Sequence, residues 1–209
     1  MSFVLHRIKK RVVSAAGRIV RTTAFVLAVL SGGLGSSCYM MDRGSALTTE
    51  AAGPWITWPA TGRPDADPYT RAHFARLGAL PLSTEVASLY IATADKSGSQ
   101  LHSSCDYQVE GRDLASHWWS LTVYDADGHI IPNAAERYGF TSDTIAMRPD
   151  SSYTVTLSRD AQPENWLPTG GAGQLALAFQ AIDLGVLAVA RDVNPVAANL
   201  PSIQRSRCR

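Results

Sequence analysis

The sequence predicts a mainly β protein, an antiparallel β-sandwich with one short helix, preceded by a single N-terminal transmembrane helix. An uncharged stretch follows a basic N-terminus, which indicates the membrane helix. Further along, short segments alternate apolar and polar residues with a period of two, and turn-forming residues separate them. With 209 residues and 45% hydrophobic content, the chain is long enough for one compact domain and an accessory segment.

The accessory segment is the predicted membrane anchor. Residues 1–21 contain six Lys and Arg and no acid, and residues 22–41 contain no charge. At about 1.5 Å per residue, a helix of that length spans the ~30 Å hydrocarbon core. Because basic residues stay on the cytoplasmic side, we expect a cytoplasmic N-terminus and a single-pass signal-anchor. The chain after about residue 42 would then be exported.

Two alternatives for this segment stay open. The segment would be a cleaved signal peptide if a peptidase removed it, although its small residues form no clear A-x-A cleavage site. It would be a lipoprotein signal if Cys38 carried lipid, but Leu34 lies one position too far from that cysteine.

The charge of the exported part argues against nucleic acid as a partner. Without the six basic residues of 1–21, 13 Lys and Arg remain against 18 Asp and Glu. A domain with this excess of acids lacks the basic surface that nucleic-acid binding requires.

Beyond the anchor we expect a linker over 42–64, a β-sandwich domain over 65–193 and a C-terminal tail over 194–209. A helix over 68–77 should open the domain, because Asp67 suits the N-cap, Pro68 the first helical position and Gly78 the C-terminal stop. The predicted strands are Leu89–Ala94, Cys105–Glu110, Trp118–Tyr124, Tyr153–Ser158 and Leu175–Gln180. The last of these would also suit a helix, and residues 185–190 could add a further strand.

Two exported cysteines could pair. Cys105 and Cys208 are an even number in a compartment where disulfides form, and a bridge would close a loop of about 100 residues. Two unrelated thiols are the alternative. His102 and Cys105 have a spacing typical of zinc ligands, but no second pair completes the four ligands, so we expect no metal.

Two sequence patterns resemble binding motifs without fulfilling them. Asp125, Asp127 and Glu136 have the spacing of calcium-loop ligands, but the glycine comes two positions early, and a hairpin turn explains the same residues. The glycines at 171 and 173 fit a dinucleotide pattern, yet they follow residues 167–169 rather than a strand, and no helix is evident after them. We therefore expect no cofactor.

One group of residues has the chemistry of a binding site. Aromatic side chains offer flat faces, and Asn and Arg offer fixed donors, a combination that suits sugars or carboxylates. The candidates are Trp119, Tyr124, Asn133, Arg137, Tyr138, Asn165 and Trp166. In the alternative interpretation, the two tryptophans belong to the core and Arg137 closes a loop by binding backbone carbonyls.

The same residues resemble the bacterial "domain of unknown function 1214" family. The resemblance rests on Trp119–Asp125, on Asn133 with Arg137-Tyr138, and on Asn165-Trp166-Leu167-Pro168 followed by a glycine-rich turn. It covers about 90–183, and the short form with one membrane helix is similar from end to end. The family implies a jelly-roll-like sandwich that faces the periplasm, with residues 22–41 as its anchor in the bacterial inner membrane. In longer relatives a second domain, "1254", precedes it, so a separate protein with that domain is an expected partner.

Two hypotheses of function follow. In the first, the domain is a non-enzymatic periplasmic module that binds a partner protein or an envelope glycan. In the second, it is a saccharide-directed hydrolase or lyase that uses Asp125, Asp127 or Glu136 beside Arg137. The two differ in where those acids lie, because a hydrolase needs them at a cleft.

Overall fold

The structure of the chain is a computed structural model that describes residues 2–84, 86–114, 118–182 and 196–209. It divides into two compact units, Met1–Ser45 and Ala46–Arg209. The first unit is almost entirely α1 (Ser2–Arg43).

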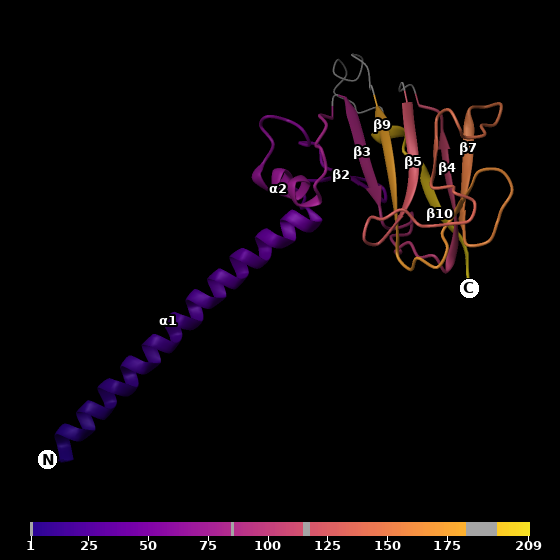
Figure 1. Ribbon diagram of the computed structural model, residues 1–209. Coiled ribbons are helices and arrows are strands. Elements are labelled where there is room, and N and C mark those ends of the chain that lie inside the picture. Colours follow the sequence, from indigo (N-terminus) through magenta and orange to yellow (C-terminus); the bar gives the residue numbers. More distant parts are fainter. Residues whose placement is uncertain (1, 85, 115–117, 183–195) are drawn as a thin grey trace. The chain divides into compact units, whose positions relative to one another are not determined.

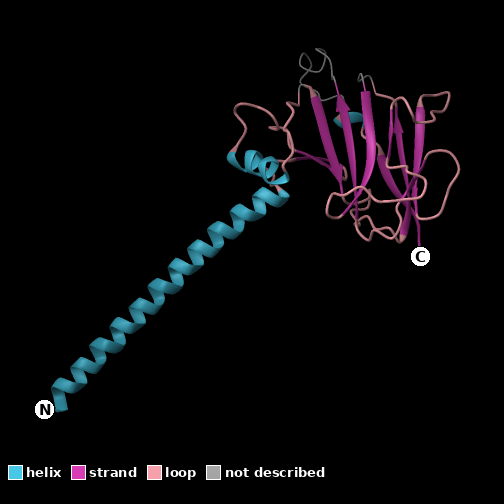
Figure 2. Cartoon of the chain, in the orientation of Figure 1, coloured by secondary structure: helices cyan, strands magenta, loops and turns pink. Residues whose placement is uncertain are grey.

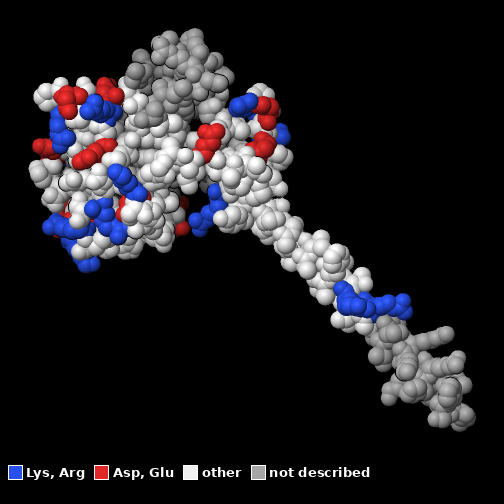
Figure 3. All heavy atoms as spheres, turned by 180° about the vertical axis from the view of Figure 1, so that it is seen from behind, with Lys and Arg blue, Asp and Glu red and all other residues white. Residues whose placement is uncertain are grey.

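Helix α1 is long and apolar enough over Gly17–Arg43 to cross a membrane, and the predicted span of 22–41 lies inside this range. None of its apolar window is buried within the protein. In Figure 3 the basic groups of α1 lie next to the grey N-terminal residues, and the helix beyond them presents an uncharged surface.

The second unit contains two sheets that pack as a sandwich (Figures 1 and 2). The six-stranded sheet is antiparallel throughout and has the order β1-β2-β3-β9-β5-β6. Its strands are β1 (Glu50–Ala52), β2 (Trp55–Thr57), β3 (Ala87–Ala92), β9 (Leu175–Ile182), β5 (Trp118–Asp125) and β6 (Gly139–Thr141).

The four-stranded sheet has the order β10-β4-β7-β8. Its strands are β10 (Ser202–Cys208), β4 (Cys105–Arg112), β7 (Ser152–Ser158) and β8 (Trp166–Pro168). The β7–β8 pair is parallel, which departs from the predicted all-antiparallel arrangement. The two-sheet architecture confirms the predicted sandwich, and its jelly-roll connectivity stays a prediction.

The core lies between the sheets and follows from the alternation in the sequence. In β5 every second residue from Trp119 to Val123 is buried, and in β7 the same holds for Tyr153, Val155 and Leu157. The ring of Trp119 stacks on Tyr153 at 4.9 Å between centroids and on Phe179 at 5.6 Å. This aromatic stack joins the two layers.

The predicted short helix is confirmed as α2 (Pro68–Leu77). Its cap is Asp67, whose Oδ1 accepts hydrogen bonds from the backbone N–H groups of Tyr69 at 2.9 Å and Thr70 at 3.0 Å. Gly78 ends the helix with a φ of 61°, a left-handed conformation that glycine adopts without steric cost.

Two segments that we predicted to be irregular belong to the sheets. The linker predicted over 42–64 contains β1 and β2, and its Trp55 is 1% exposed and donates Nε1–H to the carbonyl of Pro201 at 2.7 Å. The tail predicted over 194–209 contains η1 (Ala197–Asn199) and β10, which pairs along β4. The sequence did not predict β1 and β2 because three residues are too few to show a periodic pattern. It did not predict β10 because most of that strand is exposed and polar, so it lacks an apolar alternation.

The five predicted strands correspond to β3, β4, β5, β7 and β9, and β9 forms a strand rather than the alternative helix. The short strands β6 and β8 were not predicted. The further strand expected at 185–190 lies outside the described residues.

Candidate functional site

Of the seven predicted binding residues, Trp119 is a core residue. It is fully buried, and its Nε1–H donates to Oδ1 of Asp113 at 3.1 Å. Its one polar atom and its ring faces are therefore used inside the sandwich, as in the alternative interpretation.

Asn133 holds its own loop together. Its amide nitrogen donates to the carbonyls of Ile131 at 3.1 Å and Arg137 at 3.0 Å, and its Oδ1 accepts from the Arg137 backbone N–H at 3.1 Å. These bonds close the segment that enters β6.

Arg137 connects this loop to the other sheet. Its guanidinium donates to the carbonyl of Trp166 at 3.3 Å and lies 5.7 Å from the ring centre of Phe140. A guanidinium bound to a backbone carbonyl acts as a strut between segments, which is the alternative role that the sequence left open.

Asn165 is the most fully engaged of the seven. It is 4% exposed, and its Oδ1 accepts from the N–H of Ala146 at 2.8 Å. Its amide nitrogen donates to the carbonyls of Ala146 at 2.8 Å and Thr154 at 3.2 Å. It therefore ties an irregular loop to β7.

The other three predicted residues are partly exposed, and two of them are neighbours, because the Tyr138 carbonyl accepts from the backbone N–H of Val123, next to Tyr124, at 3.2 Å. Trp166 is half-buried and donates Nε1–H to the carbonyl of Ser158 at 3.0 Å. Tyr124 is half-buried near the end of β5, and Tyr138 is 37% exposed before β6. Three of the seven predicted residues therefore close loops and Trp119 belongs to the core, while ligand binding by the set stays a prediction.

The acids that the hydrolase hypothesis requires lie in a hairpin turn and in the loop after it. Oδ1 of Asp125 accepts from the backbone N–H groups of Asp127 at 3.0 Å and His129 at 2.8 Å, so it builds its own turn. Asp127 and Glu136 are exposed. The ligand atoms of Asp125, Asp127 and His129 lie within 4.8 Å of one another, but the turn accounts for this proximity.

Of the two reasons that we gave against the dinucleotide pattern, the lack of a preceding strand is wrong and the lack of a following helix is confirmed. Residues 166–168 do form a strand, β8, before the glycines at 171 and 173. The element that follows them is the strand β9 rather than a helix, so no helix N-terminus is available for a phosphate.

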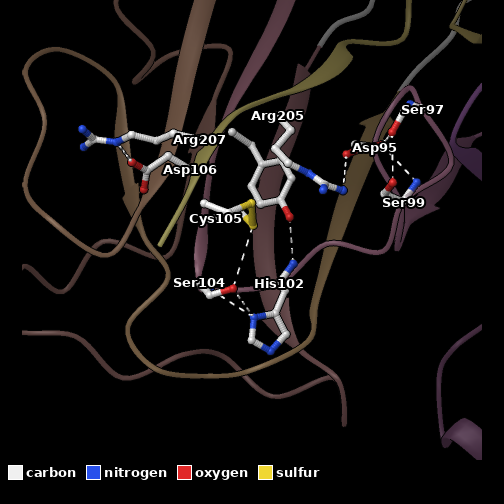
Figure 4. The surroundings of a disulfide bond; sticks show 11 residues. Asp95, Ser97, Ser99, His102, Ser104, Cys105, Asp106, Arg205 and Arg207 are labelled. Carbon is white, nitrogen blue, oxygen red and sulfur yellow. Dashed lines mark hydrogen bonds and ion pairs between the residues drawn. A yellow bond between two sulfur atoms is a disulfide. The ribbon is translucent and has the colours of Figure 1, made fainter.

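Cys105 and Cys208 form a disulfide that fastens β10 to β4 (Figure 4). Two ion pairs support the same connection. Arg205 donates to Asp95 at 2.8 Å, and Arg207 donates to Asp106 at 2.6 Å. In the same view, Nδ1 of His102 lies 2.8 Å from the hydroxyl of Ser104.

These contacts influence the ionisation of the two aspartates. Burial raises the pKa of the Asp95 carboxyl, but hydrogen bonds from Ser97, Ser99 and Arg205 outweigh this effect and leave the pKa below its ordinary value. Burial likewise raises the pKa of Asp106, and hydrogen bonds from Arg207 and Ser158 lower it further than burial raises it. Both groups are therefore held as carboxylates.

A different surface, on the outer face of the four-stranded sheet, gathers polar side chains from all four strands. The pairing places Gln204 of β10 beside Gln108 of β4, then Thr156 of β7, then Trp166 of β8. A second row holds Ser202, Glu110 and Thr154, and a third holds Arg112 and Ser152. We call these nine residues the polar sheet face.

A shallow hollow of about 390 Å³ lies at one end of the polar sheet face. Glu110, Arg112 and Arg148 line it, and the Arg148 guanidinium donates to Oγ1 of Thr154 at 2.9 Å. Gly111 also lines the hollow, and Tyr153 packs directly on it, since a Cβ at this position would lie 2.4 Å from the Tyr153 hydroxyl. The hollow therefore has an acid, two guanidinium groups and hydroxyls within one depression.

Sequence reasoning identified only Trp166 of this face. The signal is present as the polar half of the alternation, for example Gln108, Glu110 and Arg112 between Tyr107, Val109 and Gly111. The order of the strands, which brings those polar halves together, is not readable from one sequence.

Comparison with known proteins identifies the domain. Residues 86–183 match the family described as "Protein of unknown function (DUF1214)". The chain carries a DUF1214 domain. Its matched range runs from the residue before β3 to the end of β9, so β1, β2 and β10 complete the sheets around it.

One solved structure supports the fold of the DUF1214 domain, and a second is reported for comparison. The VPA0106 protein of Vibrio parahaemolyticus is 22% identical over 68% of this chain, with a TM-score of 0.55. An uncharacterised protein of Burkholderia cenocepacia is 19% identical over 59%, with a TM-score of 0.41. This chain spans 36% and 30% of the length of those two chains. A comparison with curated proteins finds no match.

Proposed function

We propose that this DUF1214 protein is an inner-membrane-anchored periplasmic module that binds an envelope glycan on the polar sheet face. The observation that carries this proposal is the row Gln204, Gln108, Thr156 and Trp166, which the strand pairing places side by side. Strands lie about 4.8 Å apart, so the row extends about 14 Å across the sheet. A glycan chain lying across the strands would meet a donor or acceptor at each step.

The chemistry of the row suits sugar hydroxyls. Amide and hydroxyl side chains both donate and accept hydrogen bonds, as sugar hydroxyls do, and they carry no charge that would select against a neutral polymer. Trp166 ends the row with a half-exposed ring that can pack against the apolar face of a sugar. Glu110, Arg112 and Arg148 in the adjoining hollow add donors and acceptors for an N-acetyl or carboxylate substituent.

Binding without turnover is favoured over hydrolysis. The acids of the hydrolase hypothesis lie in and beside the β5–β6 turn, and Asp125 is engaged by the backbone of that turn. They are not among the residues that line the hollow on the polar sheet face. Retaining and inverting glycosidases both need two carboxyl groups that flank the bond to be broken.

The test measures binding of the full-length chain, in detergent, to purified peptidoglycan and to its soluble fragments. Replacement of both row glutamines, Gln108→Ala with Gln204→Ala, should weaken binding at least tenfold and leave the melting temperature unchanged, because both side chains are exposed. Gln180→Ala, on the outer face of the six-stranded sheet, is the matched control and should bind as the original chain does. Equal binding by both variants would exclude the polar sheet face as the site.

A partner protein is a second candidate, and the length of the solved relatives favours it. This chain matches only 36% of the length of the VPA0106 chain, so in the VPA0106 protein the matched fold is part of a larger chain. We propose that a separate protein, one with the "1254" domain, associates with this chain. Purification from native membranes with mass spectrometry should recover it in a fixed ratio to this chain. Recovery of this chain alone would count against the candidate.

A further inference from the structure

We infer that a second membrane contact exists in the sandwich unit, formed by the segment that follows α2. Residues 77–82 read Leu-Gly-Ala-Leu-Pro-Leu, and all six are exposed. Leu77, Leu80 and Leu82 are 64%, 84% and 42% exposed. We call this segment the leucine loop. Isolated exposed leucines are common on protein surfaces, but three within six residues form an apolar patch that water solvates poorly.

The base of the leucine loop is fixed to the domain while the loop itself is exposed. The hydroxyl of Thr84 donates to the carbonyl of Pro59 at 3.4 Å. At Gly62, a Cβ would lie 2.4 Å from the backbone nitrogen of Ser83, so the two segments pack closely. The three leucines are therefore presented outward by a fixed scaffold.

The leucine loop lies at the end of the sandwich unit where the chain enters from the anchor. Glu50, at the start of β1, pairs with Thr57, and the next residue, Trp58, stacks on His73 of α2 at 4.2 Å. Helix α2 ends at Leu77, where the leucine loop begins. The entry of the chain and the leucine loop are thus joined through β2 and α2.

The length of the connection limits the distance to the bilayer. Helix α1 ends at Arg43 and the sandwich unit begins at Ala46. At about 3.6 Å per residue, three steps of chain extend no further than about 11 Å. If α1 spans the membrane, as the proposed function holds, the entry end of the sandwich lies close to the lipid headgroups.

Charge makes lipid the occupant that fits best. Arg71 and Arg76 are exposed on α2, just before the leucine loop, and the loop itself has no charged residue. Leucine side chains that enter the headgroup region, with cations at the level of anionic headgroups, are typical of segments that lie in a membrane interface. The leucine loop would hold the sandwich in one orientation on the outer leaflet of the inner membrane.

The experiment places single fluorescent labels on the full-length chain in nanodiscs of phosphatidylethanolamine and phosphatidylglycerol. In a Cys38→Ser background, the variant Leu80→Cys carries an environment-sensitive dye. The control is Ala126→Cys, an exposed position directly after β5. The last residue of β5 pairs with the first residue of β9, whereas Ala87 pairs with the last residue of β9, so position 126 lies at the opposite end of the sheet from Ala87. A third sample carries the dye on native Cys38, inside α1.

We expect lipid-borne spin labels to quench the dye at position 80 at least threefold more strongly than the dye at 126. A dye at 80 that aqueous iodide quenches as strongly as the dye at 126 would overturn the inference. So would a dye at 80 that neither quencher reaches, since protein would then cover the loop. Quenching at Cys38 without quenching at 80 refutes the leucine loop contact alone, whereas no lipid quenching at Cys38 refutes the anchor as well.

Discussion

At the scale of single residues, asparagine and arginine side chains of this DUF1214 domain stabilise loops by hydrogen bonds to backbone groups. A buried polar group without a partner costs about 1–3 kcal/mol, so a side chain that satisfies several such groups is difficult to replace. Asn165 makes three hydrogen bonds from a buried position, and two of them are to Ala146 in a loop that has no strand partner.

Replacement of that residue, Asn165→Ala, should lower the free energy of unfolding by about 2–3 kcal/mol, because a buried side chain and its three hydrogen bonds, worth about 1 kcal/mol each, are lost. Guanidinium unfolding followed by tryptophan fluorescence measures the change. Gln174→Ala is the control, since that side chain is exposed and makes a single hydrogen bond, 3.4 Å long, to Gln100. A loss below about 0.5 kcal/mol at position 165 would show that water replaces the amide at no cost.

Arg137 provides a second test at this scale. Arg137→Ala removes the donor to the Trp166 carbonyl and the contact with Phe140. We expect a loss of about 1 kcal/mol in the free energy of unfolding and no change in glycan binding, because the residue is not on the polar sheet face. Unchanged stability together with lost binding would return Arg137 to the role of a ligand anchor.

At the scale of elements, β10 is held to the rest of the domain by side-chain bonds as well as by backbone pairing. It is an edge strand, and one disulfide and two ion pairs to buried aspartates supplement its backbone pairing with β4. Edge strands with exposed arginines also resist pairing with other chains, which protects the sandwich from aggregation.

Loss of the disulfide should destabilise the domain. The bridge joins residues 103 positions apart, and a loop of that length contributes up to about 4–5 kcal/mol by restricting the unfolded chain. We expect the variant Cys105→Ser with Cys208→Ser to unfold at clearly lower denaturant concentration. Cys38→Ser, which removes the free cysteine of α1, should leave that midpoint unchanged. If the two midpoints agree, the bridge contributes nothing to stability.

The aspartates that bind β10 should make stability depend on pH. The pKa of Asp95 is lowered in the folded state relative to about 3.9 in an unfolded chain. Its contribution is therefore complete above that value and is lost as the pH falls through the lower, folded pKa. The original chain should lose free energy of unfolding more steeply below about pH 4 than Asp95→Asn does. Parallel curves for the two proteins, measured by denaturant unfolding at a series of pH values, would contradict this.

At the scale of the whole molecule, the boundaries of the folding unit differ from those that composition suggests. The sandwich unit runs from Ala46 to Arg209, whereas the sequence predicted a domain over 65–193. The difference consists of β1, β2 and β10, which contribute the buried side chains of Trp55 and Ile203 to the core.

Two fragments test these boundaries. A fragment of residues 46–209, exported to the periplasm, should fold and give a dispersed proton NMR spectrum, because it retains both sheets. A fragment of residues 65–193 should be unfolded or aggregated, because it loses Trp55 and exposes β3 and β4 as new edges. A well-dispersed spectrum from the shorter fragment would mean that the outer strands are dispensable.

The sequence by itself determined the features that depend on neighbouring residues along the chain. These include the uncharged helix that is long enough to cross a membrane, α2 with its two caps, and the five strands whose alternation runs over six or more residues. It also indicated which cysteines could pair. Each follows from local chemistry: the hydration of charge, the satisfaction of helix ends, and a side-chain period that decides which face is buried.

Only the tertiary structure decided which residues meet. It showed that Arg137 and Asn165 close loops, because their partners, Trp166 and Ala146, lie far away in sequence. It placed Gln204 beside Gln108 and Thr156 beside Trp166, and so created a polar sheet face that no segment displays alone. Strand order is set by the summed burial of all the apolar faces together, and that sum is a property of the whole chain.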